Sequence, residues 1–247
     1  MSLTGIMDNA LTNGKTKGLN DLLKTLRQVA VDTNAKVAKK IGIPASVAIT
    51  CVKPSGTVSQ LVDSASGIHA RHNPYYVRTV RADKKDPLAK MMHEAGFPCE
   101  DDVTKPEHTW VFSFPVKGPQ NGIYRKDMTA VEQLELWKVY QENWCEHKPS
   151  ITVSVKEGEW MAVGSWVYDN FENMSGVSFL PFADHSYRQA PYQDCSKEDY
   201  EKLVKELPQD IDWTQLAAYE KSDMTAGSQE LACSADGGCE IVDLVAV

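Results

Sequence analysis

The stretch that most constrains the fold of this chain is a short apolar run followed directly by a turn of small residues. Residues 47–52 are mostly apolar and include β-branched side chains, a composition typical of a buried strand. Pro54 ends the run, because proline fixes φ and lacks a backbone donor. Residues 53–59 then read Lys-Pro-Ser-Gly-Thr-Val-Ser. The sequence therefore predicts a buried strand that ends in a compact polar turn.

This turn has the chemistry of an anion site. Consecutive backbone N–H groups in such a turn form a concavity that usually binds phosphate, and Gly56 lets a ligand approach closely. Lys53 adds a cation nearby. An ordinary turn leaving a core strand explains the same residues equally well. The turn is not a Walker A loop, since the spacing of glycines, lysine and hydroxyl that defines that motif is absent.

The residues before this turn have the order of elements found in a β-α-β unit. Residues 2–6 resemble the end of a buried strand, and a polar segment rich in turn formers follows. From Leu19 to Val37 the apolar side chains recur at helical spacing, with Asn20 or Gly18 near the cap. The strand predicted at residues 47–52 comes next. We therefore expect an α/β fold with parallel strand pairing.

The later elements are marked by caps and by apolar periodicity. Asp86 before Pro87, Thr129 with Glu132, and Ser196 are typical of helix starts. We expect strands at residues 109–114, 151–155 and 177–180, and helices that begin near residues 87, 130, 160 and 197. Past residue 219 the composition becomes linker-like, which divides the chain into residues 1–219 and a flexible tail, 220–247.

Length and composition describe a globular protein without a nucleic-acid surface. At 247 residues, the chain is long enough for one large domain or two small ones. The net charge of −8 argues against direct nucleic-acid binding, which needs clustered Lys and Arg. No apolar run approaches 18 residues and no secretory signal is visible, so we expect no membrane span and a cytoplasmic location. The six cysteines are then expected to be reduced unless a pair does redox work.

Two pairs of possible metal ligands have too few partners to form a site. His69 and His72 lie three residues apart, and Cys145 and His147 lie two apart. A zinc site needs three or four protein ligands, and neither pair has a third candidate close in sequence. We therefore expect no metal site, and we interpret the two histidines of the first pair as residues of a solvated, hydrogen-bonded loop.

Three arginines, Arg71, Arg78 and Arg81, form a modest basic cluster in an acidic chain. A bound anion would explain their positions. Internal carboxylate partners would explain them equally well.

A pair of cysteines near the C-terminus suggests redox chemistry. Cys233 and Cys239 are separated by five small or flexible residues. A pair on a mobile arm can close a disulfide and can be reached by an external thiol. Two unremarkable thiols or a partial metal site are the alternatives. Redox work is favoured over metal binding, because no histidine or further cysteine lies close by.

Longer stretches resemble a known family. Residues 53–69, followed by Asn-Pro-Tyr-Tyr-Val-Arg-Thr-Val-Arg at 73–81, resemble the adenosylcobalamin-dependent (class II) ribonucleotide reductases. The likeness is closer to the monomeric type that reduces ribonucleoside triphosphates. It continues through residues 144–147, 151–155 and 187–192 and reaches the terminal cysteine pair, so it covers essentially the whole chain.

The resemblance implies a fold, a substrate loop and an electron shuttle. In that family, a Pro-Ser-Gly-Thr loop holds the substrate phosphates inside a ten-stranded α/β barrel. This implies that the chain forms the C-terminal portion of the barrel. Carried over to this sequence, the substrate loop comprises Pro54, Ser55, Gly56, Thr57, Val58 and Ser59. The family's C-terminal cysteine pair, matched by Cys233 and Cys239, carries electrons from thioredoxin to an active-site disulfide.

The chain also departs from the family. It has no Asn-x-Cys-x-Glu motif for the radical-bearing cysteine; residues 143–146 read Asn-Trp-Cys-Glu. The front half of the barrel and the cobalamin surface are not found either. We therefore expect a C-terminal part, from a split gene or a truncated chain, that is inactive without an N-terminal reductase half binding most of the adenosylcobalamin. The alternative is a non-catalytic module that binds nucleotide phosphates and carries a thiol switch.

Overall fold

A computed structural model of the chain describes residues 1–56, 58–182 and 187–220, and the chain divides into two compact units. Unit 1 comprises residues 1–74 and 118–185, and unit 2 comprises residues 75–117 and those from 186 onward. The chain enters unit 2 twice, at residue 75 and at residue 186, and returns to unit 1 once, at residue 118. Unit 2 therefore combines a segment inserted into unit 1 with the segment that follows unit 1. Of the two organisations that the chain length allows, the structure thus has two small units.

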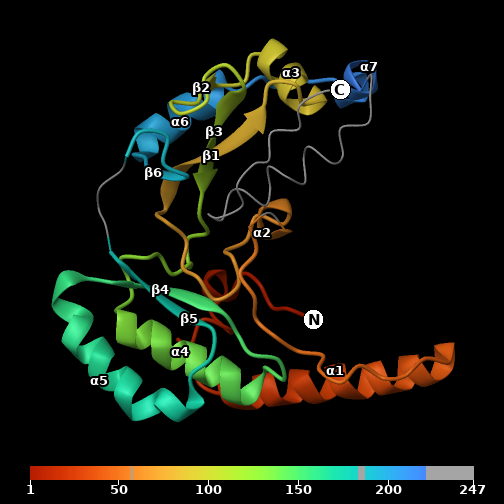
Figure 1. The fold of residues 1–247 in the computed structure, drawn as a ribbon, viewed down its shortest axis with the longest axis vertical. Helices are drawn as coiled ribbons and strands as arrows, with labels where there is room; N and C mark the ends of the chain where they lie inside the picture. The colour runs from red at the N-terminus through yellow and green to blue at the C-terminus, as the bar shows by residue number, and fades with distance from the viewer. Residues whose placement is uncertain (57, 183–186, 221–247) are drawn as a thin grey trace, which may run out of the picture. The chain divides into compact units, whose positions relative to one another are not determined.

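Unit 1 combines helices with a parallel pair of strands (Figure 1). Its elements are η1 Ile6–Asp8, α1 Leu19–Ile41, α2 Val58–Leu61, α4 Ala130–Asn143, β4 Ile151–Val155, η2 Glu157–Glu159, α5 Trp160–Asn170, η3 Phe171–Asn173 and β5 Val177–Pro181. Strands β4 and β5 pair in parallel, with Ile151 opposite Val177. Together β4, α5 and β5 form a β-α-β unit, which confirms the strands predicted at both positions.

The core of unit 1 lies between β4 and α4. Alternate residues of β4, namely Ile151, Val153 and Val155, are buried, because successive side chains of a strand point to opposite faces. Trp137 and Tyr140 of α4 are fully buried in the same cluster. The aromatic face of this helix is therefore core, as its sequence indicates.

Residues 47–52 do not form the predicted strand. Their parallel pairing is limited to one bridge between Cys51 and Ser2, and Val47 is 100% exposed. The reason is a competing acceptor: the Glu146 carboxylate accepts the backbone N–H groups of Ile49 and Thr50, at 3.0 and 3.2 Å. These two donors therefore bind a side chain instead of a neighbouring strand. The parallel direction was predicted correctly, but the strand was not.

Unit 2 is an antiparallel sheet with helices. Its elements are β1 Tyr75–Asp83, α3 Pro87–Glu94, β2 Cys99–Asp101, β3 Thr109–Lys117, β6 Tyr192–Asp194, α6 Lys197–Glu206, η4 Trp213–Gln215 and α7 Leu216–Tyr219. The strand order is β2-β3-β1-β6. The helix starts predicted at Asp86 and Ser196 are confirmed, since both side chains accept N–H groups of the first turn.

Strand β1 lies between β3 and β6 in this sheet, and its sequence does not predict a strand. Its charged residues break the alternation of apolar and polar side chains, and its burial is irregular, with Tyr76 and Thr79 buried. Thr79 is fixed by tertiary contacts: its Oγ1 donates to the Ala190 carbonyl at 2.9 Å. Such a strand is defined by its neighbours. Across the described residues of both units, no helix has the length and apolarity needed to cross a membrane.

Candidate functional site

The candidate phosphate loop, residues 53–59, begins at the core of unit 1. Val52 directly before it and Ile68 on the returning segment are both fully buried. The backbone N–H of Lys53 donates to the Ser2 hydroxyl at 3.0 Å, and its Nζ donates to the Ser150 hydroxyl at 3.0 Å. The base of the loop is therefore fixed, and a cation is held beside it.

The loop is closed by the segment that follows it. The backbone N–H of Ser55 donates to the hydroxyl of Ser66 at 2.7 Å. Ser59, at the start of α2, is fully buried, and its carbonyl accepts the backbone N–H of Ser64 at 2.9 Å. Residues 55–59 are thus tied to residues 64–66 by short polar contacts, which give the loop a defined shape.

Gly67 is required for this closure. Its φ is +52°, and a Cβ at this position would lie 2.8 Å from the carbonyl oxygen of Lys53. Both the backbone conformation and the close approach exclude a larger residue. The short distance shows how tightly the returning segment lies against the loop.

Gly56 has a different environment. It is exposed, and a Cβ built on it would meet no described atom within 4 Å. Contacts within the chain therefore do not require glycine here, whereas a ligand that approaches the backbone would. Ser55 Oγ is buried and has no hydrogen-bond partner among the described residues. Thr57 lies outside the described residues, while Pro54 and Val58 are exposed.

His69 is a structural residue of the loop's support. Its Nδ1 lies 3.0 Å from the Ser66 carbonyl, and its Nε2 accepts the backbone N–H of Thr152 in β4 at 2.9 Å. Burial lowers the pKa of His69, although the hydrogen bond to Ser66 opposes this shift. The neutral ring with the proton on Nδ1 satisfies both contacts. Because both ring nitrogens are used, His69 is a hydrogen-bonded residue as predicted, but it is partly buried rather than solvated.

The returning segment is fastened by a buried ion pair. Arg71, whose side chain is 5% exposed, donates from Nε to the Asp8 carboxylate at 3.0 Å. Asp63 is a second carboxylate partner of Arg71, also at 3.0 Å. Asp8 in turn accepts the backbone N–H of Ala65 at 2.7 Å. This network connects η1 to both ends of residues 63–71.

Internal carboxylates, rather than a bound anion, also explain a second arginine of the basic cluster. In unit 2, Arg81 Nε donates to Asp102 Oδ2 at 2.7 Å. Arg78 stacks over the ring of Tyr192, with its guanidinium carbon 4.3 Å from the ring centre. For Arg71 and Arg81 the structure therefore decides between the two explanations that the sequence leaves open.

The cysteines of the described residues are free thiols. Burial, together with the neighbouring Cys51, raises the pKa of Cys145 to about 12. Burial likewise raises the pKa of Cys99 and of Cys195, with Asp101 and Asp199 adding to the effect. These three thiols are poor nucleophiles at neutral pH, because the thiolate is the reactive form. Cys233 and Cys239 lie outside the described residues.

Metal ligands do not gather in the part of the chain that the structure describes: it contains no group of three His, Cys, Asp or Glu side chains able to hold an ion. The Cys145 and His147 pair thus gains no further ligand there. Glu146 between them binds backbone, accepting N–H groups from Ile49 and Thr50.

The chain is similar to several proteins that share one name. No family model matches the chain. A sequence named adenosylcobalamin-dependent ribonucleoside-triphosphate reductase from Euglena gracilis is 28% identical over 200 residues, and one from Lactobacillus gasseri is 26% identical over 231 residues. A "probable" reductase of the same name from Dictyostelium discoideum is 30% identical over 183 residues. These matches cover 79%, 90% and 71% of this chain, respectively.

A solved structure agrees with the sequence relatives. The crystal structure of a B12-dependent (class II) ribonucleotide reductase matches 84% of this chain with a TM-score of 0.71 and 26% identity. The chain is homologous to adenosylcobalamin-dependent ribonucleoside-triphosphate reductases. It spans 24–30% of the length of the three sequence relatives and 29% of the solved reductase chain. The α/β fold class and the resemblance to the reductases are therefore confirmed.

Sequence reasoning found the loop but missed its supports. Ser66, Gly67 and His69 fix its conformation, and they lie in the same small-residue stretch that carries the resemblance to the reductases. Gly67 directly after Ser66 was an available signal, since a glycine beside a hydroxyl residue often allows close backbone approach. Ser2 and Ser150 gave no such signal, because they are distant in sequence and reach the loop only through the tertiary fold.

Proposed function

We propose that this chain provides the substrate-phosphate loop and the electron-delivery tail of an adenosylcobalamin-dependent ribonucleoside-triphosphate reductase. It would act together with the reductase sequence that its relatives carry beyond the matched segment. The observation that supports this most strongly is the match to a solved class II reductase over 84% of the chain with a TM-score of 0.71. The product would be a deoxyribonucleotide.

The loop at residues 54–59 suits a triphosphate. Its backbone is held by Ser66 and by the core below Val52, so little conformational entropy is lost on binding. Gly56 leaves open space for phosphate oxygens, and Lys53 supplies a positive charge nearby. In this proposal Pro54, Ser55, Gly56, Thr57 and Val58 contact the substrate phosphates, while the fully buried Ser59 supports the loop through its hydrogen bond with Ser64.

The cysteine pair at 233 and 239 would deliver electrons. A thiolate of the reduced pair attacks the active-site disulfide formed during turnover, and a mixed disulfide results. The second cysteine then attacks this bond, so the active site regains two thiols and the pair becomes a disulfide. Thioredoxin or a similar dithiol reduces the pair again, transferring two electrons and two protons. The raised pKa values of Cys99, Cys145 and Cys195 favour the tail pair as the exchanging thiols. The four free cysteines of the described residues suit a reducing compartment such as the cytoplasm.

Adenosylcobalamin supplies the initiating radical in the proposed reaction. The groove of unit 1 that lies along α1 does not suit this cofactor, since of its lining side chains only Thr33, Asn34 and Ser46 are polar. A corrin ring is edged with amide groups that need many hydrogen-bond partners. We therefore assign the cofactor to the reductase sequence beyond this chain and derive no step through it.

Reconstitution tests this function. The chain would be studied by size exclusion with light scattering, alone and with the polypeptide that carries the remaining reductase sequence. We expect a one-to-one complex that reduces ribonucleoside triphosphates with adenosylcobalamin and thioredoxin. A folded monomer that ignores this polypeptide but binds nucleotide by itself would instead support a non-catalytic phosphate-binding module with a thiol switch.

A further inference from the structure

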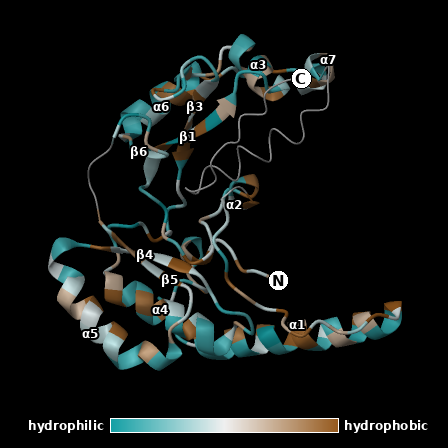
Figure 2. Ribbon diagram, in the orientation of Figure 1, coloured by the Kyte–Doolittle hydropathy of each residue, from teal (hydrophilic) through white to brown (hydrophobic). Residues whose placement is uncertain are grey.

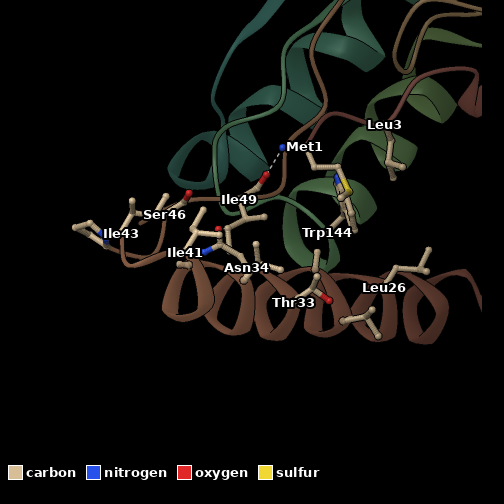
Figure 3. A pocket seen from close by; sticks show the side chains of 15 residues that line it. Met1, Leu3, Leu26, Thr33, Asn34, Ile41, Ile43, Ser46, Ile49 and Trp144 are labelled. Carbon is tan, nitrogen blue, oxygen red and sulfur yellow. Dashed lines mark hydrogen bonds between the residues drawn. The ribbon is translucent and has the colours of Figure 1, made fainter.

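An apolar groove runs along the C-terminal half of α1 (Figure 3). Its volume is about 610 Å³. Side chains of α1, among them Leu26 and Ile41, form one wall, and Met1, Ile49 and Trp144 lie opposite. The groove belongs entirely to unit 1. None of its lining side chains carries a charge, and the ammonium group of Met1 donates to the Ile49 carbonyl, so the lining is mainly apolar.

The α1 wall has the pattern of a helix-packing seam. Leu26, Ala30, Thr33 and Val37 follow one another at spacings of four, three and four residues. This spacing keeps one stripe of a helix facing a second helix that crosses it at a shallow angle. Ala30 and Thr33 are small, so a partner helix can approach closely at the middle of the seam.

Ala30 is buried, but the larger apolar side chains along this wall are left partly uncovered by the described part of the chain. Leu26, Val37 and Ile41 are 40%, 46% and 60% exposed. Figure 2 shows hydrophobic residues recurring along α1 up to its C-terminal end. An exposed apolar surface of this extent is typical of an interaction site.

Basic side chains flank the seam. On a helical projection of α1, Arg27, Lys36 and Lys40 lie to either side of the apolar stripe. Flanking charges of this kind select the partner of a packed helix through complementary charges on its own edges. A partner helix with an apolar stripe and acidic edges fits both features.

We propose that an amphipathic helix from the reductase sequence beyond the matched segment docks in this groove. This inference rests on the proposed function and adds the surface through which the assembly forms. The chain accounts for only 29% of the solved reductase chain whose fold it shares, so most of the assembly's apolar surface lies outside it. The docked helix packs against the seam of α1 on one side and against Met1 and Trp144 on the other.

Binding measurements on groove variants test the proposal. Val37→Glu places a charge in the seam at a half-exposed position and is expected to weaken binding of the remaining reductase polypeptide by about tenfold or more. Lys39→Gln makes the same change in net charge on the opposite face of α1 and should leave binding within about twofold of the parent chain. Hydrogen exchange should show protection of residues 29–41 in the complex. Circular dichroism checks the fold, and Ile41→Ser replaces Val37→Glu if that variant unfolds.

The possible results separate this inference from the proposed function. An active complex in which α1 stays unprotected and both groove variants bind normally would overturn the docking surface but leave the function intact. Absence of any complex and of any turnover would overturn the proposed function, and the docking surface with it. A homodimer of the parent chain that Val37→Glu converts to monomer, or an apolar small molecule retained in native mass spectra, would also overturn the proposed occupant.

Discussion

At the scale of single residues, the loop is shaped by side chains that lie outside it. The Ser66 hydroxyl accepts the Ser55 N–H. Gly67 has no Cβ, and a Cβ there would lie only 2.8 Å from the Lys53 carbonyl oxygen. His69 connects the same segment to β4. Gly56, by contrast, contacts nothing that would exclude a side chain. The two glycines therefore have different roles: Gly67 is needed for folding, while Gly56 is available for a ligand.

Substitution of Gly56 separates these roles. Gly56→Val should leave the free energy of unfolding within about 0.5 kcal/mol of the parent chain, because the new side chain meets open space. In the assembled enzyme it should raise the KM for ribonucleoside triphosphate roughly tenfold, since it crowds the phosphates. Steady-state kinetics measure this effect. Gly158→Val is the control, because Gly158 also faces open space but lies away from the loop. Unchanged kinetics for Gly56→Val would remove the loop from the substrate site.

Asp102 makes stability depend on pH. Burial acts to raise its pKa, but hydrogen bonds from Thr104, Arg81 and Lys105 outweigh burial and hold the pKa far below its usual value. A carboxyl group with a depressed pKa in the folded state stabilises the fold above its unfolded pKa, near 4. This contribution, on the order of 3 kcal/mol, is lost as the pH falls below about 4.

Urea unfolding across this pH range provides the measurement. The free energy of unfolding of the parent chain should fall steadily as the pH drops below about 4. Asp102→Asn should have a lower free energy of unfolding at neutral pH, and this value should change less with pH below about 4. Glu100→Gln is a suitable control, since its contact with Arg188 is long, 3.7 Å, and exposed. If the free energy of unfolding of Asp102→Asn fell as steeply below about pH 4 as that of the parent chain, Asp102 would not be the source of the pH dependence.

At the scale of elements, helix caps decide where helices begin. Thr129 starts α4 with a capping box: its Oγ1 accepts the Glu132 N–H at 3.2 Å, and Glu132 accepts the Thr129 N–H at 2.8 Å. The hydrogen bonds with Thr129 lower the pKa of Glu132. This helix carries the central aromatic residues of unit 1, so its start fixes the position of the core.

Removal of this cap should be measurable. Thr129→Ala is expected to lower the free energy of unfolding by about 1 kcal/mol, because one N–H group of the first turn loses its acceptor. Chemical denaturation gives the value. Thr25→Ala in the exposed middle of α1, where the hydroxyl bonds the Asp21 carbonyl at 2.8 Å, should change it by less than about 0.5 kcal/mol. If both variants lost the same free energy of unfolding, the capping box would contribute no more to stability than a hydroxyl within the helix.

At the scale of the whole molecule, the proposed electron route depends on the tail. The double variant Cys233→Ser/Cys239→Ser should abolish multiple turnover with thioredoxin in the assembled enzyme, while a prereduced sample should still complete one turnover. Quenched-flow measurement of product per active site distinguishes the two cases. Cys99→Ser is the control, because its thiol has a raised pKa and no part in the proposed route. Full thioredoxin-driven turnover by the double variant would reject the shuttle.

Local signals in the sequence were sufficient for most helices and for β3, β4 and β5. Caps such as Asp86 and Thr129 act within a few residues, and so does apolar spacing along α1. A turn at residues 53–59 could also be predicted, because a run of small polar residues is unusual directly after an apolar run. The resemblance to the reductases added the expected roles of that turn and of Cys233 and Cys239, which remain predictions.

The tertiary structure decided what depends on distant partners. Residues 47–52 have the composition of a strand, yet the Glu146 carboxylate takes two of their donors. Residues 75–83 lack a clean alternation, yet β3 and β6 pair with them as β1. Arg71 and Arg81 could have bound an anion, yet Asp8 and Asp102 neutralise them. In each case a hydrogen-bonding group far away in sequence outweighs the local preference, because a buried donor or charge must find a partner wherever the fold supplies one.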